Sequence, residues 1–459
     1  MRSNQNRARW FVVAVALLWV LGSCPVFAQT GASDEWTLRQ TIDISLAKNP
    51  DAALAQAETR AAQAGVEQAR AALLPHLQLT QDLTRGNDPV YAFGTRLRQQ
   101  RFTQADFALN ALNRPTPINN FGTQISGNWQ LFDWWGSQDR MRSARLTAQS
   151  AAAMSRQANQ AIVLRVVQAY QAMLYAQRRE SVARHEVATA QALLHDAQTR
   201  VRAGLAVDSD VLTAQVNLSE RQQEQIAAEG DVESAWAALE AAMGIDHAAR
   251  HRLAPIPPRS YPDGVLDEQI AEALKTRPDL DALRKQQAAA AAAVKAARAS
   301  LLPAVNTYGS WETDRDSFAG TGGNHWLAGV QLQLDILPLG KRARLDQQKA
   351  LRQQAEARQR AGEAQIRLAV SRAFTAHRTA ERIVATAQAS MQQAAESLRI
   401  LQNRYQAGLT TMTDLLRAED AQRQSQNNYW RAVYGNTVSY AQLMYATGAL
   451  TPAAAENLQ

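Results

Sequence analysis

The chain has 459 residues, enough for two or three ordinary domains, with 49 Lys and Arg against 42 Asp and Glu and a net charge of +7. The basic residues are scattered among Glu, Asp and Gln, a pattern typical of solvated helix faces, so no nucleic-acid partner is expected. A single cysteine excludes a disulfide within the chain. After the N-terminal segment no apolar run reaches about 18 residues, so no transmembrane helix is predicted.

The first 28 residues are predicted to be a secretory signal peptide. Three arginines precede an apolar run at residues 10–22, and small residues lie at positions −3 and −1 of a cleavage site after Ala28. Cys24 lies inside this segment, in a Leu-Gly-Ser-Cys sequence that also fits a lipoprotein signal. Cleavage after Ala28 is favoured and removes the only thiol. Acylation of Cys24 is the alternative, and it would tether the mature N-terminus.

The remainder of the sequence repeats itself. Ala-Arg-Ala-Ala-Leu-Leu-Pro at residues 69–75 returns as Ala-Arg-Ala-Ser-Leu-Leu-Pro at residues 297–303, an offset of 228, and Gly204 returns as Gly408, an offset of 204. The offset between matching residues falls from 228 to 204, so the first half contains 24 residues that the second half lacks. They are assigned to a loop at about 86–121. Two halves of one architecture are therefore predicted, differing mainly in one loop.

These features divide the chain after the signal peptide. The first repeat covers residues 29–254 and the second covers residues 265–450. A proline-rich linker at 255–264 joins them. The tail at 451–459 is expected to be disordered.

Each half is expected to begin with a helix, continue as two strands and end in a long helical hairpin. In the first half the helix starts at a capping box of Thr37 and Gln40 and is broken at Asn49-Pro50. After each Leu-Leu-Pro the hydrophobic period changes from 3.6 to 2, which predicts strands. The expected strands are residues 75–79, 124–131, 305–311 and 326–334.

The predicted strands are about 10 residues long, the length of a tilted membrane-spanning β-strand. Five tryptophans lie at or near their ends, and an aromatic girdle at a membrane interface is favoured over ordinary core tryptophan. Four strands cannot close a barrel, and an open edge in lipid leaves backbone groups unpaired, so two, three or four chains would have to combine. The five residues are Trp129, Trp134, Trp135, Trp311 and Trp326.

The predicted hairpin helices are too long for an ordinary globule. The segment 138–203 would extend about 95 Å. Narrow apolar stripes with polar flanks predict helices packed side by side in a coiled-coil-like sheet. The stripes contain Ile162, Val166, Val167, Tyr170 and Met173 in the first half, and Ile366, Val370 and Phe374 in the second.

Each hairpin turns at an Ala-Gly-Leu sequence. Gly204 and Gly408 can end a helix in the left-handed conformation. Asp210 and Asp414 suit the start of the next helix, where a carboxylate meets free N–H groups and the positive end of the helix dipole. The predicted tips are Ala203, Gly204 and Leu205 in the first half and Ala407, Gly408 and Leu409 in the second.

The sequence resembles the TolC family of outer-membrane efflux proteins over roughly residues 36–450. The resemblance depends on the order of its features: a signal peptide, two similar halves, two strands in each half and paired Ala-Gly-Leu tips. The resemblance implies an α+β membrane protein in the outer membrane of a Gram-negative bacterium. It implies a homotrimer whose 12-stranded β-barrel lies in outer-membrane lipid and continues into a long periplasmic α-helical barrel, with the linker and chain ends as a belt.

The function that the resemblance implies is a passive exit duct of a tripartite efflux or type I secretion system. A periplasmic adaptor protein and an inner-membrane transporter would open it at its periplasmic end. The Gly-Leu pairs at 204–205 and 408–409 match the segments on which adaptor hairpins dock.

The resemblance also assigns residues to a periplasmic gate. Asp210 and Tyr405 match a hydrogen-bonding lock between neighbouring helices. Ser209 keeps a hydroxyl at another lock position, but Thr410 replaces its arginine partner.

Of two further gate positions, one keeps the family pattern and one departs from it. Asp414 matches the first of two aspartates that ring the periplasmic constriction, and Arg417 replaces the second. Three Asp414 side chains around a threefold axis would repel one another and raise the pKa of that carboxyl, unless Arg417 pairs with it. From the residues alone, a plain helix N-cap is the favoured role of Asp414.

No enzyme and no cofactor are predicted. His185-Glu186 lacks the second histidine of a zincin motif, and the glycines at 320–323 lack the Lys-Ser/Thr of a phosphate loop. His247 and His251 are spaced to chelate a metal on a helix, but no carboxylate or thiol follows in register. Two rival interpretations stay open: a secreted or periplasmic coiled-coil scaffold without a pore, and a periplasmic binding protein or enzyme.

Overall fold

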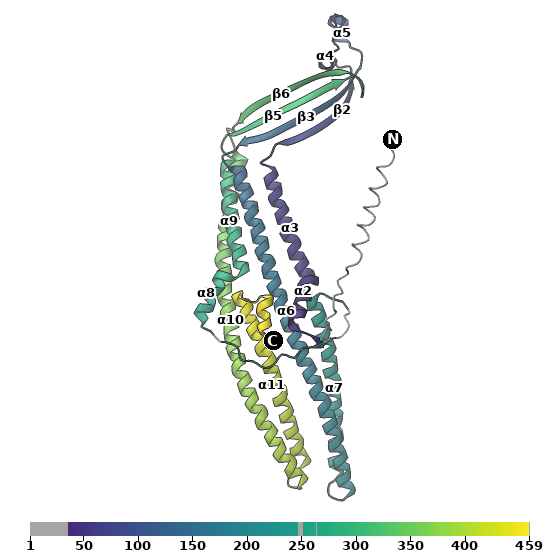
Figure 1. Ribbon diagram of the computed structural model, residues 1–459, viewed down its shortest axis with the longest axis vertical. Helices are drawn as coiled ribbons and strands as arrows, with labels where there is room; N and C mark the ends of the chain where they lie inside the picture. Colours follow the sequence, from purple (N-terminus) through teal and green to yellow (C-terminus); the bar gives the residue numbers. More distant parts are fainter. Residues whose placement is uncertain (1–34, 247–250, 263, 459) are drawn as a thin grey trace, which may run out of the picture.

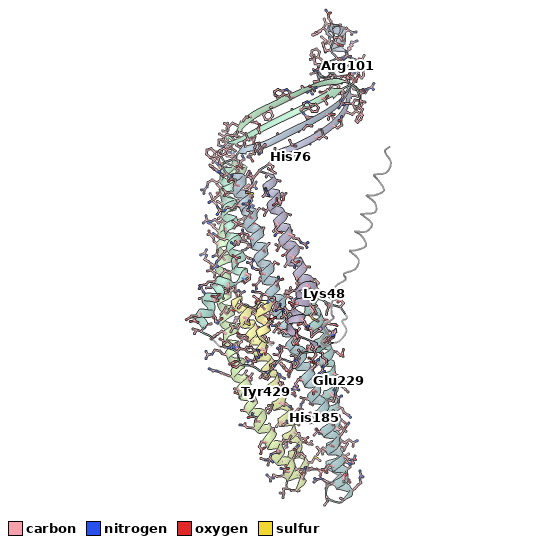
Figure 2. The ribbon with its side chains drawn as sticks, viewed as in Figure 1. Lys48, His76, Arg101, His185, Glu229 and Tyr429 are labelled. Carbon is pink, nitrogen blue, oxygen red and sulfur yellow. The ribbon has the colours of Figure 1, made fainter. Side chains whose placement is uncertain are left out.

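A computed structural model describes residues 35–246, 251–262 and 264–458 and shows an elongated molecule (Figure 1). A four-stranded sheet lies at one end, long helices run away from it, and two helical hairpins form the other end. Figure 2 marks His76 where the sheet meets the helices and Arg101 beyond the far end of the sheet. The predicted signal peptide, with Cys24, and His247 lie outside the described residues.

The two halves have the same order of main elements and nearly equal helix lengths: 11 and 11, 22 and 22, 67 and 68, and 36 and 36 residues. The two structural repeats are therefore confirmed. The first half comprises β1 (Glu35–Trp36), α2 (Leu38–Lys48), α3 (Pro50–Ala71), β2 (His76–Gly86), α4 (Pro89–Arg98), α5 (Leu109–Asn113), β3 (Ile118–Phe132), α6 (Gly136–Arg202) and α7 (Asp208–Met243). The second comprises β4 (Arg252–Leu253), α8 (Leu266–Thr276), α9 (Pro278–Ala299), β5 (Ala304–Arg315), β6 (Gly322–Gln333), α10 (Leu339–Gln406) and α11 (Met412–Thr447).

Local capping chemistry sets the first helices as predicted. Thr37 and Gln40 form the capping box before α2, each side chain bonded to the other residue's backbone N–H. The Asn49 side chain accepts a hydrogen bond from the Asp51 N–H, and Pro50 occupies the first position of α3. Arg277-Pro278 makes the equivalent break between α8 and α9.

The four long strands form one antiparallel sheet in the order β2-β3-β5-β6. The prediction of two strands per half is confirmed, and the strands, of 11 to 15 residues, are longer than expected. Within the described chain, β2 and β6 pair on one side only. The sheet therefore does not close on itself and has two open edges.

The two faces of this sheet differ in polarity because successive side chains alternate and directly paired residues share a face. One face is apolar: Leu79 pairs with Ile125, Ile125 with Trp311, and Trp311 with Trp326. Along it Leu77, Leu79, Val330 and Leu332 are 69–71% exposed, too much apolar surface for a chain that stays alone in water. The other face is polar, with His76, Gln78, Gln124, Ser126, Asn128, Glu312, His325 and Gln331.

α6 runs from the sheet to the first tip and connects the helical part. Near the sheet it packs against α3 and α9, and farther along against α7 and α11. The predicted apolar stripes are buried, with Ile162, Val166 and Tyr170 at 0–1% exposure. After its first residue α6 contains neither Gly nor Pro, whereas α7 contains Gly230 and α11 contains Gly435, each with open space where a Cβ would lie. No described helix has the length and hydropathy needed to cross a bilayer.

Each hairpin returns to the helix break of its own half through a glycine. Gly244, which follows α7, has φ +69°, and a Cβ added to it would lie 2.6 Å from the Cα of Asn49. Gly448, which follows α11, has φ +78°, and its added Cβ would lie 3.1 Å from the Cα of Arg277. The return helices are therefore fixed against the two X-Pro breaks at places where only glycine fits without displacement.

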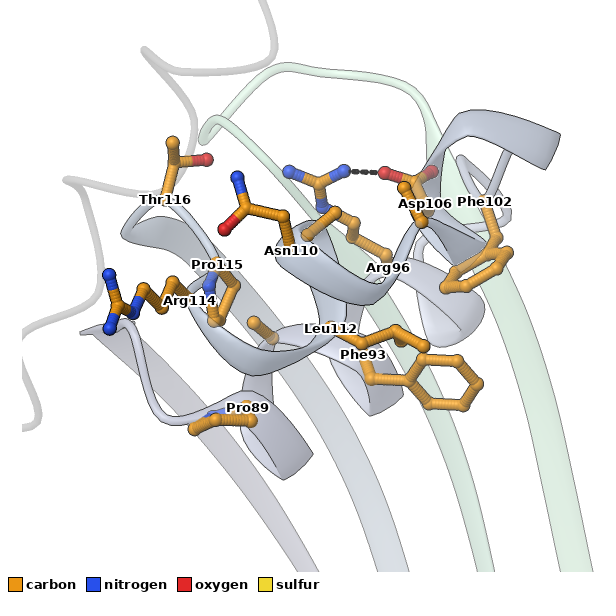
Figure 3. Close-up of a pocket in the computed structure, with 13 residues that line it drawn as sticks. Pro89, Phe93, Arg96, Phe102, Asp106, Asn110, Leu112, Arg114, Pro115 and Thr116 are labelled. Atoms are coloured by element: carbon orange, nitrogen blue, oxygen red, sulfur yellow. Dashed lines mark hydrogen bonds and ion pairs between the residues drawn. The ribbon is translucent and has the colours of Figure 1, made fainter.

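The additional segment of the first half folds into α4, a short 3-10 turn and α5 beyond the far end of the sheet. Its phenylalanines form an edge-to-face cluster, with ring centroids 4.8 Å apart for Phe93 and Phe102 and 5.0 Å for Phe102 and Phe107. Figure 3 shows the Arg96–Asp106 ion pair beside a pocket in this segment.

The expected disorder of the tail at 451–459 is wrong for the described residues. Thr451 caps α12 (Pro452–Ala455), and Ala455 and Leu458 are fully buried. These two apolar side chains join the core beside α2, where Glu456 pairs with Arg39. The tail is ordered because its two apolar residues, three apart in the sequence, pack into a core assembled from distant segments, which the sequence alone does not reveal.

The described part of the linker at 255–264 forms no helix or strand. It is nevertheless held in place. Tyr261 is buried, stacks on Tyr440 at 4.4 Å between ring centroids, and donates its backbone N–H to Glu381 at 2.8 Å.

Candidate functional site

The two predicted tips have the same backbone geometry. Gly204 has φ +71° and Gly408 has φ +72°. The Leu205 N–H donates to the Arg200 carbonyl at 2.9 Å, and the Leu409 N–H donates to the Arg404 carbonyl at 2.8 Å. These bonds are those of a Schellman motif, in which a glycine adopts the left-handed conformation after the helix. Ala203 and Ala407 are the C-cap residues. Leu205 and Leu409 are 78% and 67% exposed, so each tip presents a leucine to the surroundings.

Tyr405 connects the two tips, although not through the predicted partner. Its ring is buried and lies 4.7 Å from the guanidinium carbon of Arg200, whose Nη1 donates to the Tyr405 carbonyl at 3.3 Å. Asp196 accepts a hydrogen bond from the Arg200 Nε at 2.9 Å and holds the guanidinium in place. Burial raises the pKa of Tyr405, and the charge of Arg200 opposes that rise. Arg200, on α6, thereby links the first hairpin to α10.

Asp210 and Ser209 lie in the first turn of α7. Within the described residues of one protomer, the Asp210 carboxylate and the Tyr405 hydroxyl form no hydrogen bond with each other. Asp210 is close enough for its negative charge to contribute to the raised pKa of Tyr405. The Ser209 carbonyl accepts a hydrogen bond from the Thr213 hydroxyl within α7.

Asp414 takes part in a capping box at the start of α11. Its carboxylate accepts hydrogen bonds from the Thr411 hydroxyl at 2.7 Å and the Thr410 hydroxyl at 3.2 Å, and Thr411 is the N-cap. These bonds lower the pKa of Asp414, with a smaller contribution from Arg417, whose Nη1 lies 3.9 Å from the carboxylate. The N-cap role inferred for Asp414 is therefore wrong: Thr411 is the N-cap, and Asp414 is the third residue of the helix, whose carboxylate completes the capping box.

A charge cluster that the sequence did not indicate joins the two hairpins above the tips. Arg221 of α7 is buried and lies 3.2 Å from the Asp420 carboxylate of α11, while Arg423 of α11 lies 3.2 Å from the Glu224 carboxylate of α7. Each helix thus supplies the arginine of one ion pair and the carboxylate of the other. They hold the returning helices together because separating the helices would break both ion pairs, although Arg221 also pairs with Glu224 of its own helix at 2.9 Å.

Two further carboxyls complete this cluster. Burial raises the pKa of Glu419 to about 7, with added repulsion from Glu186 and Asp420. Burial likewise raises the pKa of Glu186 on α6, against the attraction of Arg423 and Arg221. The cluster thus contains a carboxyl that loses its proton near neutral pH.

We expect the Glu419→Gln variant to make the contact between the hairpins less sensitive to pH. The pKa of Glu419 is raised in the folded protein, so its contribution to stability is full below about pH 4.5, the ordinary pKa, and is lost as pH rises through 7. At pH 8 the variant should be more stable locally by on the order of 1 kcal/mol, after allowance for solvent screening. Hydrogen exchange of α7 and α11 at pH 6 and pH 8, corrected for intrinsic rates, measures this.

Glu229→Gln, on α7 outside the cluster, is the matched control and should behave as wild type. Equal pH dependence in wild type and Glu419→Gln would contradict the role given to Glu419.

The tryptophans occupy two levels of the sheet rather than one. The Trp129 indole N–H donates to the Leu73 carbonyl at 3.0 Å and that of Trp134 to the Pro303 carbonyl at 2.9 Å, which ties the strand ends to both Leu-Leu-Pro helix ends. Trp135 precedes α6 with φ +62°. Trp311 and Trp326 face each other across β5 and β6, about 13 Å farther along the strands than Trp129.

An open-edged sheet with one apolar face, joined to long helices that end in paired tips, defines a class of membrane channel. The chain belongs to the outer membrane efflux protein family, whose sequence model matches residues 41–245 and 269–449. The chain is 28% identical to Protein CyaE of Bordetella pertussis over 84% of this chain and 78% of that protein. It is 25% identical to the pyoverdine export outer membrane protein OpmQ of Pseudomonas putida, over 86% and 82%.

The fold agrees with solved outer-membrane channels. The CmeC outer membrane channel of Campylobacter jejuni superposes with a TM-score of 0.77, covering 95% of this chain and 93% of that chain at 17% identity. Family and fold together identify an outer-membrane exit duct of the kind that works in tripartite efflux and secretion systems, with its helical part in the periplasm. The scaffold alternative is set aside because it leaves the apolar face of the sheet unexplained.

Proposed function

We propose that three copies of this chain close into one passive tube, with a 12-stranded barrel in the outer membrane continuing into a periplasmic helical barrel. The observation that carries the proposal is the four-stranded sheet with two open edges and one exposed apolar face. Joining β6 of one copy to β2 of the next satisfies backbone groups that lipid cannot. Three copies is the number that the TolC resemblance implies.

In this tube the apolar face contacts outer-membrane lipid and the polar face lines a water-filled lumen. Trp129, Trp134 and Trp135 would lie at the periplasmic interface, where an indole with a bonded N–H is stable. The export role of OpmQ, by its name, supports outward transport of solutes through this lumen.

The gate is proposed to lie at the helical tips. In the resting state three contacts hold the two hairpins of a protomer together: the cation–π contact of Arg200 with Tyr405 and the ion pairs of Arg221 and Arg423. Asp210, Ser209, Asp414 and Arg417 lie at the helix starts beside these contacts. A periplasmic adaptor that binds the tips and changes these contacts would shift the population towards an open tube. The inner-membrane transporter supplies the energy.

Leu205 and Leu409 are the proposed docking residues because they are the exposed apolar side chains of two equivalent turns. The test places a photo-crosslinking amino acid at position 205 or 409 in the source bacterium and identifies the adducts by mass spectrometry. Both positions should give an adduct with a periplasmic adaptor protein.

Leu109, in α5 beyond the far end of the sheet, is as exposed as Leu205 at 78% and is the matched control position. It should give no adaptor adduct. The proposed orientation would be contradicted if neither tip position formed an adduct with an adaptor in the assembled protein. It would also be contradicted if only position 109 formed such an adduct.

A further inference from the structure

Three metal-ligating side chains meet on the polar face of the sheet, near its far end. Glu312 and Asp314 lie on β5, and His325, on β6, is paired directly with Glu312. The His325 Nε2 lies 3.3 Å from the Glu312 Oε2 and 3.7 Å from the Asp314 Oδ2. One ligand atom from each of the three side chains lies within 4.8 Å of the others.

Asp314 is the unusual member of this group because it is fully buried. Its Oδ1 accepts a hydrogen bond from the Asn120 side chain of β3, whereas its buried Oδ2 has no hydrogen-bond partner. A buried carboxylate oxygen without a partner is costly. This oxygen faces His325, so whatever compensates it lies between the two side chains.

The surroundings hold the Asp314 carboxylate in this orientation. Gln99, which follows α4, donates its side-chain N–H to the Asn120 side-chain oxygen at 3.0 Å and so sets the direction of the Asn120 amide. A Cβ at Gly323 would overlap the carbonyl oxygen of Arg98, so the end of α4 lies directly against β6 here. Such outer hydrogen bonds orient the carboxylates of metal sites.

The two distances from His325 suit a tetrahedral ion, and the two carboxylates lie within 4.8 Å of each other. Zinc bonds to imidazole nitrogen and carboxylate oxygen are about 2.0–2.2 Å long, which places tetrahedral ligands about 3.3–3.6 Å apart. The two distances from His325 are close to that range. Imidazole also favours a transition metal over Mg²⁺ or Ca²⁺, which prefer oxygen ligands alone.

We propose that Glu312, Asp314 and His325 bind one divalent transition-metal ion of the Zn²⁺ class per chain, with a fourth position left for water. The ion neutralises the buried Asp314 oxygen and the Glu312 oxygen that faces His325. The other Glu312 oxygen lies 3.4 Å from the Arg98 guanidinium. Through Asn120 and Gln99 the ion also stabilises the junction between the sheet and the additional segment at 87–117, at the outer opening of the duct.

The test uses the full-length protein in detergent, purified without a histidine tag and stripped with a chelator. Titration calorimetry with ZnCl₂ should show one Zn²⁺ per chain, and CoCl₂ should give the visible absorption of a tetrahedral site. His325→Gln and Glu312→Gln should each lose this binding. Asn120→Ala should weaken it about tenfold, because it removes only the orienting hydrogen bond.

His76→Gln is the matched control, since His76 lies on the same polar face but at the end of the sheet opposite to the proposed site. It should bind Zn²⁺ as wild type does. Circular dichroism and oligomer migration on gels verify that each variant is folded. No stoichiometric Zn²⁺ binding by the folded wild type would overturn the proposal. Undiminished binding by folded His325→Gln, or binding of Ca²⁺ as tight as that of Zn²⁺, would also overturn it.

Discussion

Replacing Gly244 by alanine will prevent the protein from accumulating as an assembled oligomer, whereas the same change at Gly204 will not. Both glycines follow a long helix, with φ +69° and +71°. Alanine in the left-handed region costs about 1 kcal/mol at either position. At Gly244 the new Cβ would also lie 2.6 Å from the Cα of Asn49 and 3.1 Å from the Lys48 carbonyl oxygen, whereas at Gly204 nothing lies within 4 Å.

Backbone atoms cannot rotate away as a side chain can, so the Gly244 variant must displace the start of α3 from α7. That movement would also break the hydrogen bonds of Ser45 and Asn49 to the Ala242 carbonyl. The total loss is expected to exceed about 3 kcal/mol, a large fraction of the stability of a domain. Gel migration of unheated membrane extracts measures the oligomer. Equal amounts of oligomer from Gly204→Ala and Gly244→Ala would refute this account of the return turn.

Arg221→Gln will raise the open probability of the duct in planar bilayers about tenfold. The change removes a buried cation and leaves Glu224, Glu419 and Asp420 with less positive charge to offset their repulsion. A loss of about 1.4 kcal/mol of contact between the hairpins corresponds to a tenfold shift in a closed-to-open equilibrium.

The control for this experiment is Arg179→Gln. Arg179 forms an ion pair with Asp231, which joins α6 to α7 within one hairpin and not across the two hairpins. Removing it should leave the open probability near that of wild type. An Arg221→Gln channel that stays as closed as wild type, in an intact oligomer, would show that the gate lies elsewhere.

Local rules of the backbone made much of this fold predictable. The capping box of Thr37, the break at Asn49-Pro50 and the glycine turns of the tips each depend on a few adjacent residues, so their structures follow from the sequence. Period-2 alternation located the strands for the same reason. The equal spacing of the tip motifs then related the two halves.

Contacts between distant segments could not be predicted in this way. Arg200 and Tyr405 are separated by 205 residues, and no local pattern marks a guanidinium that will lie over that ring. The expected pairing of Tyr405 with Asp210 came from a family resemblance, and in one protomer the tyrosine contacts Arg200. The buried tail has the same explanation: Leu458 is ordered by a core assembled from α2, α6 and α11.

The position of glycine in the helices determines where the periplasmic end can bend. α6 has 67 residues and spans about 100 Å as a rod of uniform flexural stiffness, since neither Gly nor Pro interrupts it after Gly136. The returning helices each carry one glycine, Gly230 and Gly435, and within one protomer no atom lies within 4 Å of a Cβ added at either position. Compared with α6, the returning helices α7 and α11 are therefore where we expect curvature to concentrate when a lateral force acts on a tip.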